Sequence, residues 1–383
     1  MSQFEYRCLE SIADVDREHW SPLFGNSPEG FDYFLACERV PPDAFEYSAV
    51  AVFRNARLVA GAPVFSTRFN PGLILDGVGR TVYDGLSSVV SAMRNVPMVG
   101  LGTPHTQEPT VYFDPDLTAA EKSDAFEVML AGLDQIAEAK KARVLVVKDA
   151  SNDTGQWGGE SLESAGYSRI TALPVATLEV PTSEDDYFAA LSGNMRSNLR
   201  RRLKRAKNVR VELRETCADI NAEMIRLRQG TMARGSGDFA NFASTSDAFY
   251  PQVLSDAADS SRLFTYWLDG ALLGFAMVSV SNDQLVQNYN GMRYPDGPDN
   301  GIFYLDWMSQ LRYCMDNGIR EMQSGVTTYL IKARLGCSFH HRYYYIRHRY
   351  GMVNRIIKSA SKDINFGDSD PGLIELGEDA PFA

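Results

Sequence analysis

The sequence has few of the residues that build a disulfide framework or a metal centre. Its 383 residues include five cysteines and five histidines. The cysteines are odd in number and form no C-x-x-C pair, which is typical of a reduced, cytosolic chain. The histidines show no ligand spacing, because the adjacent His340 and His341 would point to opposite faces of a strand. We therefore expect no bound metal.

Long apolar runs are also missing. No run approaches the roughly 20 residues that a membrane helix needs. The N-terminal segment MSQFEYRCLESIADVD has no basic start followed by an apolar stretch, so we expect no signal peptide. These absences predict a cytoplasmic protein, with any contact at the inner membrane being peripheral.

Positive charge is scarce overall but dense in one segment. The formal net charge is −11, yet eight of the fifteen residues from 196 to 210 are Arg or Lys. Helical spacing would place four of these cations on one face and an apolar seam beside it. The cations are Arg196, Arg200, Lys204 and Lys207, and the seam is Met195, Leu199, Leu203 and Ala206. The segment therefore predicts an amphipathic helix that packs on one side only.

This cationic face has two interpretations. Basic helix faces are usually solvated, but no acid lies between Asp186 and Glu212, and such a density of like charge favours an anionic partner. Candidate partners are a phosphate-bearing ligand, the acidic surface of another protein, an RNA and anionic lipid headgroups. The overall acidity of the chain argues against nucleic acid in general.

The two halves of the chain repeat one order of elements. Each half is predicted to contain a β-hairpin, an amphipathic helix, a strand, a glycine-bounded loop and a last strand. The turn at Asp269 and Gly270 marks the second hairpin, and Thr118 with Glu121 forms a capping box before the first helix. The later elements are offset by about 170 to 176 residues, which indicates a tandem duplication.

This repeat sets the expected domain boundaries. We expect an N-terminal domain at 1–182, a C-terminal catalytic domain at 183–355 and an acidic, loosely held tail at 356–383. The segments TALPVATLEV and RYYYIRHR are expected to close the sheet of their own halves.

Several motifs in the second half resemble the FemAB-like branch of the GNAT acyltransferase superfamily. They are, in order, YFAALSGNMRSNLRRRLKRAKN, YWLDGALLGFAMV, LVQNYNGMRYP, CMDNGIREMQSG and YLIKARLGCSF. The resemblance covers most of residues 185–350, and the first half fits as a degenerate copy. It implies an α+β fold of two tandem GNAT-like domains, each a mixed central sheet flanked by helices.

The resemblance also implies where an acyl donor would bind. In such folds the donor lies between two splayed central strands, here 284–291 and 319–324, and a backbone N–H polarises its carbonyl. One departure concerns the Q/R-x-x-G-x-G/A loop that holds the CoA pyrophosphate, because the corresponding segment is GMRYPDGPDNG. The RGSG segment at 234–237 is interpreted as a flexible substrate loop. CoA or acyl-CoA is the expected donor, with an acyl carrier protein or an aminoacyl-tRNA as alternatives.

Candidate site residues follow from these positions. The catalytic candidates are Asp238, Asp306 and Lys332, and the candidates for substrate or donor binding are Arg196, Arg200, Tyr289, Asn290, Arg293 and Tyr329. A carboxylate beside aromatic residues can act as a base if its pKa is raised, and the resemblance implies that a lysine in the TYLIKARLG context stabilises a carbonyl or a phosphate. Each has a structural alternative: a loop or capping Asp, a helix-dipole partner, a surface lysine or a packed aromatic residue. His105 is expected to be structural or at the surface.

Three functions are compatible with these patterns. The first is an N-acyltransferase that moves an acyl group from acyl-CoA or an acyl carrier protein to a primary amine. Bacterial ceramide synthases, which the chain also resembles, would imply a long-chain or sphingoid amine. The second is a Fem-type transferase that uses aminoacyl-tRNA, with tRNA the less favoured donor. The third is a non-enzymatic protein that binds a membrane or nucleic acid through its basic helix.

Overall fold

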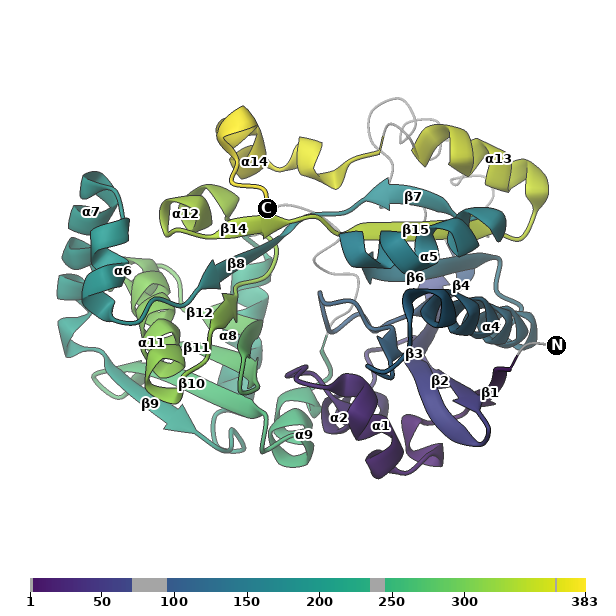
Figure 1. Ribbon diagram of the computed structural model, residues 1–383. Coiled ribbons are helices and arrows are strands. Elements are labelled where there is room, and N and C mark those ends of the chain that lie inside the picture. Colours follow the sequence, from purple (N-terminus) through teal and green to yellow (C-terminus); the bar gives the residue numbers. More distant parts are fainter. Residues whose placement is uncertain (1–2, 71–94, 235–244, 362–363) are drawn as a thin grey trace.

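The computed structural model describes residues 3–70, 95–234, 245–361 and 364–383. Within these residues the strands form two mixed sheets that lie side by side, each flanked by helices (Figure 1). The strands of the first sheet are β1 (Glu5–Leu9), β2 (Glu46–Arg54), β3 (Arg57–Phe69), β4 (Val96–Leu101), β5 (Tyr112–Phe113), β6 (Val144–Ala150), β7 (Ser168–Thr171) and β15 (Tyr343–His348). The strands of the second sheet are β8 (Val175–Glu179), β9 (Arg210–Arg214), β10 (Ser261–Leu268), β11 (Ala271–Val280), β12 (Gln284–Met292), β13 (Glu321–Gln323) and β14 (Ser338–His340).

The helices divide between the two sheets in a similar way. Those of the first half are α1 (Arg17–Phe24), α2 (Phe31–Arg39), α4 (Ala119–Ala139) and α5 (Asn152–Ser164). Those of the second half are α6 (Glu184–Ala190), α7 (Gly193–Arg205), α8 (Asn221–Met232), α9 (Phe249–Asp256), α10 (Asp296–Asp299), α11 (Ile302–Asn317) and α12 (Tyr329–Arg334). Near the C-terminus, α13 (Gly351–Ala360) and α14 (Pro371–Leu376) follow.

Local signals in the sequence place the main elements. Asp269 and Gly270 have positive φ angles and form the turn between β10 and β11, as two-residue hairpins require. The capping box of Thr118 and Glu121 opens α4. Gly318, with φ of 69°, ends α11 in the left-handed conformation. These three predictions are confirmed.

Both sheets have the same strand order, which confirms the tandem architecture. In space the first sheet runs β1-β2-β3-β4-β6-β15-β7, with β5 added on β3, and the second runs β9-β10-β11-β12-β13-β8-β14. In each, two neighbouring central strands are parallel: β4 with β6, and β12 with β13. The helix that connects each parallel pair, α4 or α11, packs against its own sheet.

The closing strands differ from expectation, because the two halves exchange them. β8, from the first half, pairs with β13 and β14, whereas β15, from the second half, pairs with β6 and β7. The prediction that each closes its own sheet is therefore wrong. Pro174 separates β7 from β8, and a proline donates no ladder hydrogen bond, so the chain leaves the first sheet there. Strand periodicity reveals burial but does not identify the partner sheet.

A shared core joins the two halves. α2 packs against α9 between the sheets (Figure 1), and one buried cluster includes Phe34 from the first half with Phe249, Tyr250 and Phe275 from the second. The segment expected to form a loose tail is also attached. Phe339 exchanges backbone hydrogen bonds of 2.8 and 3.0 Å with the last residues of the chain, because the apolar residues of this acidic segment pack on the second domain.

Candidate functional site

The two central strands of the second sheet separate after a short parallel pairing. Gln284–Val286 of β12 pairs with Glu321–Gln323 of β13, after which β13 ends and β12 continues. Opposite β11 the register shifts, so that Asn288 has no paired residue in the ladder. Such a bulge leaves one residue outside the regular ladder. The pairing of the two strands therefore ends at Val286 and Gln323, two residues before the bulged Asn288, and we call this end of the pairing the splay.

Two carboxylates from the first domain hold the side chains at this opening. Asn288 Nδ2 on β12 donates to Glu29 Oε1, and Gln323 Nε2 on β13 donates to Glu108 Oε1 at 2.8 Å. Glu29 lies in the loop before α2, and Glu108 lies in the loop after β4. We call Glu29, His105, Glu108, Asn288 and Gln323 the interdomain cluster.

Glu29 is the most perturbed carboxyl of this cluster. Its side chain is 1% exposed, and its second oxygen accepts a hydrogen bond from the Thr106 hydroxyl. Burial, followed by the neighbouring Glu108 charge, raises the pKa of Glu29 to about 8, although hydrogen bonds from Thr106 and Asn288 oppose the shift. Carboxyls with such pKa values are typical of catalytic sites.

His105 is buried in the cluster, so of the two expected placements, structural or at the surface, the surface one is excluded. Its Nδ1 lies 2.6 Å from the Tyr289 hydroxyl, and its ring stacks on Phe249 at 4.4 Å. Burial, with a smaller contribution from Lys148, lowers the pKa of His105 to about 3. The imidazole is therefore neutral at physiological pH.

Three buried polar atoms of the cluster lack a hydrogen-bond partner within the described part of the chain. They are Oδ1 of Asn288, Oε1 of Gln323 and Nε2 of His105. Unsatisfied buried polar groups are rare and each requires an explanation, such as a ligand.

The catalytic candidates from the sequence occupy different surroundings. Lys332 is buried, and its Nζ donates to the carbonyls of Ser324 and Gly325 at 2.6 and 3.0 Å, directly after β13. Burial lowers the pKa of Lys332 to about 8. Lys332 therefore lies beside the splay, whereas Asp238 lies outside the described residues, as does most of the RGSG segment.

Asp306 is buried beneath β12. Its carboxylate accepts hydrogen bonds from the Tyr266 hydroxyl at 2.5 Å and from Gln310 Nε2 at 2.7 Å, with Gln287 Nε2 at 3.4 Å. Burial raises the pKa of Asp306 to about 6. All of these partners belong to the second domain, and they connect Asp306 to the strand that carries Asn288.

The binding candidates fall into two groups. Tyr289 contacts His105 in the cluster. Asn290 is exposed, Arg293 is paired with Glu223 at 2.7 Å, and the buried Tyr329 donates to the Pro174 carbonyl at 2.7 Å. Only Tyr289 among these is brought to the interdomain cluster in the described structure.

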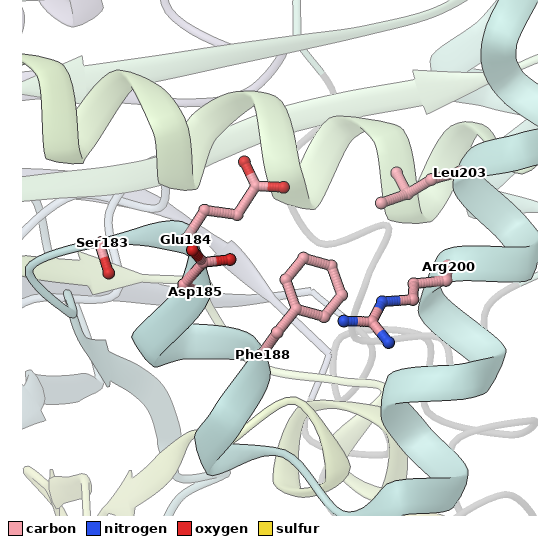
Figure 2. A pocket seen from close by; sticks show the side chains of 6 residues that line it. All are labelled: Ser183, Glu184, Asp185, Phe188, Arg200 and Leu203. Atoms are coloured by element: carbon pink, nitrogen blue, oxygen red, sulfur yellow. The ribbon is translucent and has the colours of Figure 1, made fainter.

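The basic segment forms α7, and its apolar seam packs as predicted. Two flanks of α7 face different neighbours. On one, the Arg200 guanidinium lies 5.1 Å from the Phe188 ring, beside a groove of about 470 Å³ that Glu184 and Asp185 also line (Figure 2). On the other, Arg202 lies 5.7 Å from the Tyr304 ring at the start of α11.

The loop before α11 differs from a pyrophosphate cradle. Its amides donate within the loop: Gly297 to Arg293, Asp299 to Pro295, Asn300 to Asp296 and Gly301 to Pro298. A Cβ on Gly301 would meet the Arg202 carbonyl oxygen at 2.7 Å, so α7 packs directly on this loop. Nε of Arg202 is buried and has no partner among the described residues. Donor phosphates here would therefore depend on the cations of α7.

Sequence reasoning missed both carboxylates of the cluster. Glu29 lies in no motif, and Gln323 lies in the CMDNGIREMQSG segment but was not singled out there. Glu108 follows His105 in the loop GTPHTQEP, where it gave no separate signal. Asn288 and Glu29 are 259 positions apart, so only the fold brings them together. The described residues contain no group of three or more metal-ligating side chains. They also contain no helix with the length and apolar character needed to span a bilayer.

Residues 193–332 match the family described as an acetyltransferase (GNAT) domain. Among solved structures, FemX has a TM-score of 0.59 and 12% identity, over 90% of this chain and 98% of FemX. A tandem GNAT protein from the clavulanic acid biosynthesis pathway, solved without AcCoA, has a TM-score of 0.52 and 12% identity, over 90% and 98%. L-PGS from Bacillus licheniformis has a TM-score of 0.50 and 9% identity, over 89% and 98%.

No curated protein matches the sequence. Residues 193–332 thus match a GNAT acetyltransferase domain, and the likeness of the fold to a tandem GNAT protein and to FemX supports an acyltransferase. The more specific likeness to ceramide synthases finds no support in these comparisons.

Proposed function

We propose that this tandem GNAT acyltransferase transfers an acyl group from an acyl thioester to a primary amine at the interdomain cluster. The thioester would belong to acyl-CoA or to an acyl carrier protein. The observation that supports this most directly is the separation of β12 and β13 at the bulged Asn288. A thioester carbonyl at the bulge could accept a hydrogen bond from the backbone amide, which would stabilise the oxyanion formed during attack.

Two further residues of the second domain support this arrangement. Lys332 fixes the two carbonyls that follow β13, so it would hold one wall of the splay and place positive charge near the reacting carbonyl. Asp306, through Gln287, would hold the other wall. Correct placement of donor and amine supplies much of the rate enhancement in such a reaction.

The donor phosphates would bind at the start of α11, beside the Arg202 flank of α7. This flank has a buried guanidinium nitrogen without a partner among the described residues. The flank that carries Arg200 adjoins Glu184 and Asp185, whose charges disfavour an anion, and Arg196 lies one helical turn before Arg200 on α7. Both flanks are candidates for the phosphate site. Substitutions in the two flanks are expected to have opposite effects on KM for acyl-CoA, so one experiment distinguishes them.

The experiment measures amide formation and CoA release with acyl-CoA donors of increasing chain length and a panel of primary amines, including a sphingoid base. Loss of one charge-assisted phosphate contact of about 1.5–3 kcal/mol should raise KM for acyl-CoA by roughly 10- to 100-fold in R202Q. We expect R196Q/R200Q to retain a wild-type KM, and Tm to stay near wild type in both. The reverse order would assign the donor to the Arg200 flank, and no product from any thioester would contradict the proposed reaction.

An aminoacyl-tRNA is the second candidate donor. The exposed cations of α7 and the likeness of the fold to FemX favour it. Activity that requires charged tRNA and disappears on ribonuclease treatment would replace the thioester donor by this one.

The amine acceptor is proposed to be a long-chain or sphingoid amine presented at an anionic membrane surface. The supporting observation is α13, in which Met352 and Ile356 are 79% and 64% exposed. The cations Arg349, Arg355 and Lys358 beside them are exposed as well. Exposed apolar residues flanked by cations are typical of helices that lie in an anionic lipid interface. Their charge contrasts with the net charge of −11 of the whole chain.

A further inference from the structure

The two amides at the splay are oriented by the carboxylates that hold them. The NH₂ groups of Asn288 and Gln323 are committed to Glu29 and Glu108, so their amide oxygens must point elsewhere. Neither oxygen has a partner within residues that the structure describes, although Gln323 is completely buried. Each splayed strand therefore presents one buried, unsatisfied hydrogen-bond acceptor beside a carboxylate.

The cations close to these acceptors are already engaged. Lys148 pairs with Asp149, and its Nζ also donates to the Thr106 carbonyl at 2.5 Å. Arg342 Nη2 contacts both carboxylate oxygens of Glu108 at 3.2 Å. The groups left open are two amide oxygens and one neutral imidazole nitrogen. This set fits a ligand group that is positively charged and carries several donors, and a primary ammonium has three N–H donors.

We propose that the interdomain cluster is the subsite for the acceptor amine, and that Glu29 removes the proton that this amine must lose. The substrate ammonium would donate to Glu29 and to the open oxygens of Asn288 and Gln323. This inference rests on the proposed function and adds to it a subsite and a base from the first domain. Burial raises the pKa of Glu29 to about 8, and a general base is most effective when its pKa lies near the working pH.

The proposed reaction comprises a proton transfer to Glu29, attack by the amine and release of a thiolate. One N–H bond of the ammonium breaks as an O–H bond forms on Glu29, which leaves a neutral amine. The nitrogen lone pair forms the N–C bond to the thioester carbonyl, and the C–S bond breaks with release of the thiolate. The thiolate takes the second nitrogen proton, and Glu29 later returns its proton to solvent.

This assignment gives the degenerate first half a chemical role. Glu29 and Glu108 both come from the first domain, whereas Asn288 and Gln323 come from strands of the second. The acceptor subsite would then exist only where the two domains meet, and neither domain would carry it alone.

The activity test compares wild type with E29Q, and E38Q is the matched control. Glu38 on α2 is also a glutamate whose pKa burial raises, but its oxygens accept from Ser11 and from the Ile12 amide, away from the splay. Loss of a general base typically lowers kcat by roughly 10²–10⁴-fold. We expect this loss in E29Q and wild-type kcat in E38Q, with KM for the donor unchanged in both.

The pH profile adds a readout that a purely structural role would not change. In wild type kcat/KM should rise through about pH 8 as Glu29 ionises. In E29Q only free amine from solution can react, so the rise should continue towards the pKa of the amine itself, about 10. If E29Q keeps the wild-type rate and profile while wild type transfers acyl groups, Glu29 is not the base.

A binding measurement that needs no turnover separates this inference from the proposed reaction. The probe is n-butylammonium chloride, compared with sodium chloride at equal ionic strength, at a pH where Glu29 is ionised. A ligand that binds only the native state raises Tm, so we expect a rise in wild type and E38Q but not in E29Q. If no acyl donor reacts and this pattern still appears, the reaction is wrong and the ammonium subsite stands. Equal shifts in all three proteins, or no shift in any, overturn the subsite.

Discussion

Asp306 and Glu29 are both buried carboxyls, but their surroundings give them different roles. The Asp306 oxygens accept hydrogen bonds from Tyr266 and Gln310 within one domain. Its pKa is raised from 3.8 to about 6, so the folded state holds the proton more tightly across that range. The free energy of unfolding should therefore fall as pH rises through this window.

In D306N this dependence should disappear, because the amide does not titrate. Between about pH 3.8 and pH 6, we expect the Tm of D306N to change less than the Tm of wild type. We expect the kcat of D306N to remain within a few-fold of the wild-type kcat. Thermal melts over the pH range and steady-state kinetics check both points. A loss of kcat by two orders of magnitude, with Tm preserved, would instead make Asp306 a catalytic base.

The sequence allowed some single residues to be placed, but not the pairs that they form. Tyr289 could be placed on a central strand because the order of motifs locates that strand, and Lys332 became a candidate through its TYLIKARLG context. Glu29 could not, since its burial and its contact with Asn288 depend on packing between domains across 259 positions. A pKa shift caused by desolvation has no signature in the local sequence.

At the scale of elements, α13 exposes several apolar side chains, among them Met352 and Ile356. None of its residues is buried, and Ile356 is 64% exposed, which closely matches Ile374 on α14 at 62%. Removing an apolar side chain of this size from a lipid interface should cost about 1.5–3 kcal/mol. We therefore expect I356S to weaken binding to phosphatidylglycerol-containing vesicles by roughly tenfold, and I374S to have little effect.

Vesicle co-sedimentation checks this prediction, with pure phosphatidylcholine vesicles as the reference. Binding should be weaker on the neutral vesicles and should decrease with salt, because the exposed cations of α13 contribute through charge. Equal losses in I356S and I374S, or equal binding to both lipids, would contradict a specific role for α13.

Elements could be predicted where their signals are local. The seam of α7, the turn at Asp269 and the capping box of α4 each depend on a few neighbouring residues, and each appears as expected. The predicted boundary at 355 falls inside α13, in a segment whose sequence was interpreted as an acidic tail poor in pattern. The partner sheets of β8 and β15 were missed because strand pairing is not local.

At the scale of the whole molecule, the exchange of strands makes the two domains interdependent. β15 lies between β6 and β7 in the first sheet, and β8 lies between β13 and β14 in the second. The cluster that contains Phe34 and Phe249 also spans both halves. Each sheet thus contains a strand that belongs to the other half of the chain. This exchange would hold the proposed subsite together and limit the movement of Glu29 relative to Asn288.

We therefore expect neither residues 1–182 nor residues 183–383 to fold alone. The first fragment would lack β15 from the interior of its sheet and would carry β8 without its partners, and the second would have the reverse defect. An interior strand contributes hydrogen bonds worth about 1 kcal/mol each and buried side chains worth about 1.5–3 kcal/mol each, which is a large share of typical domain stability. Circular dichroism melts should show no cooperative transition for either fragment, and co-expression should restore a complex with one transition. A cooperative melt of either fragment alone would show that its sheet does not need the exchanged strand.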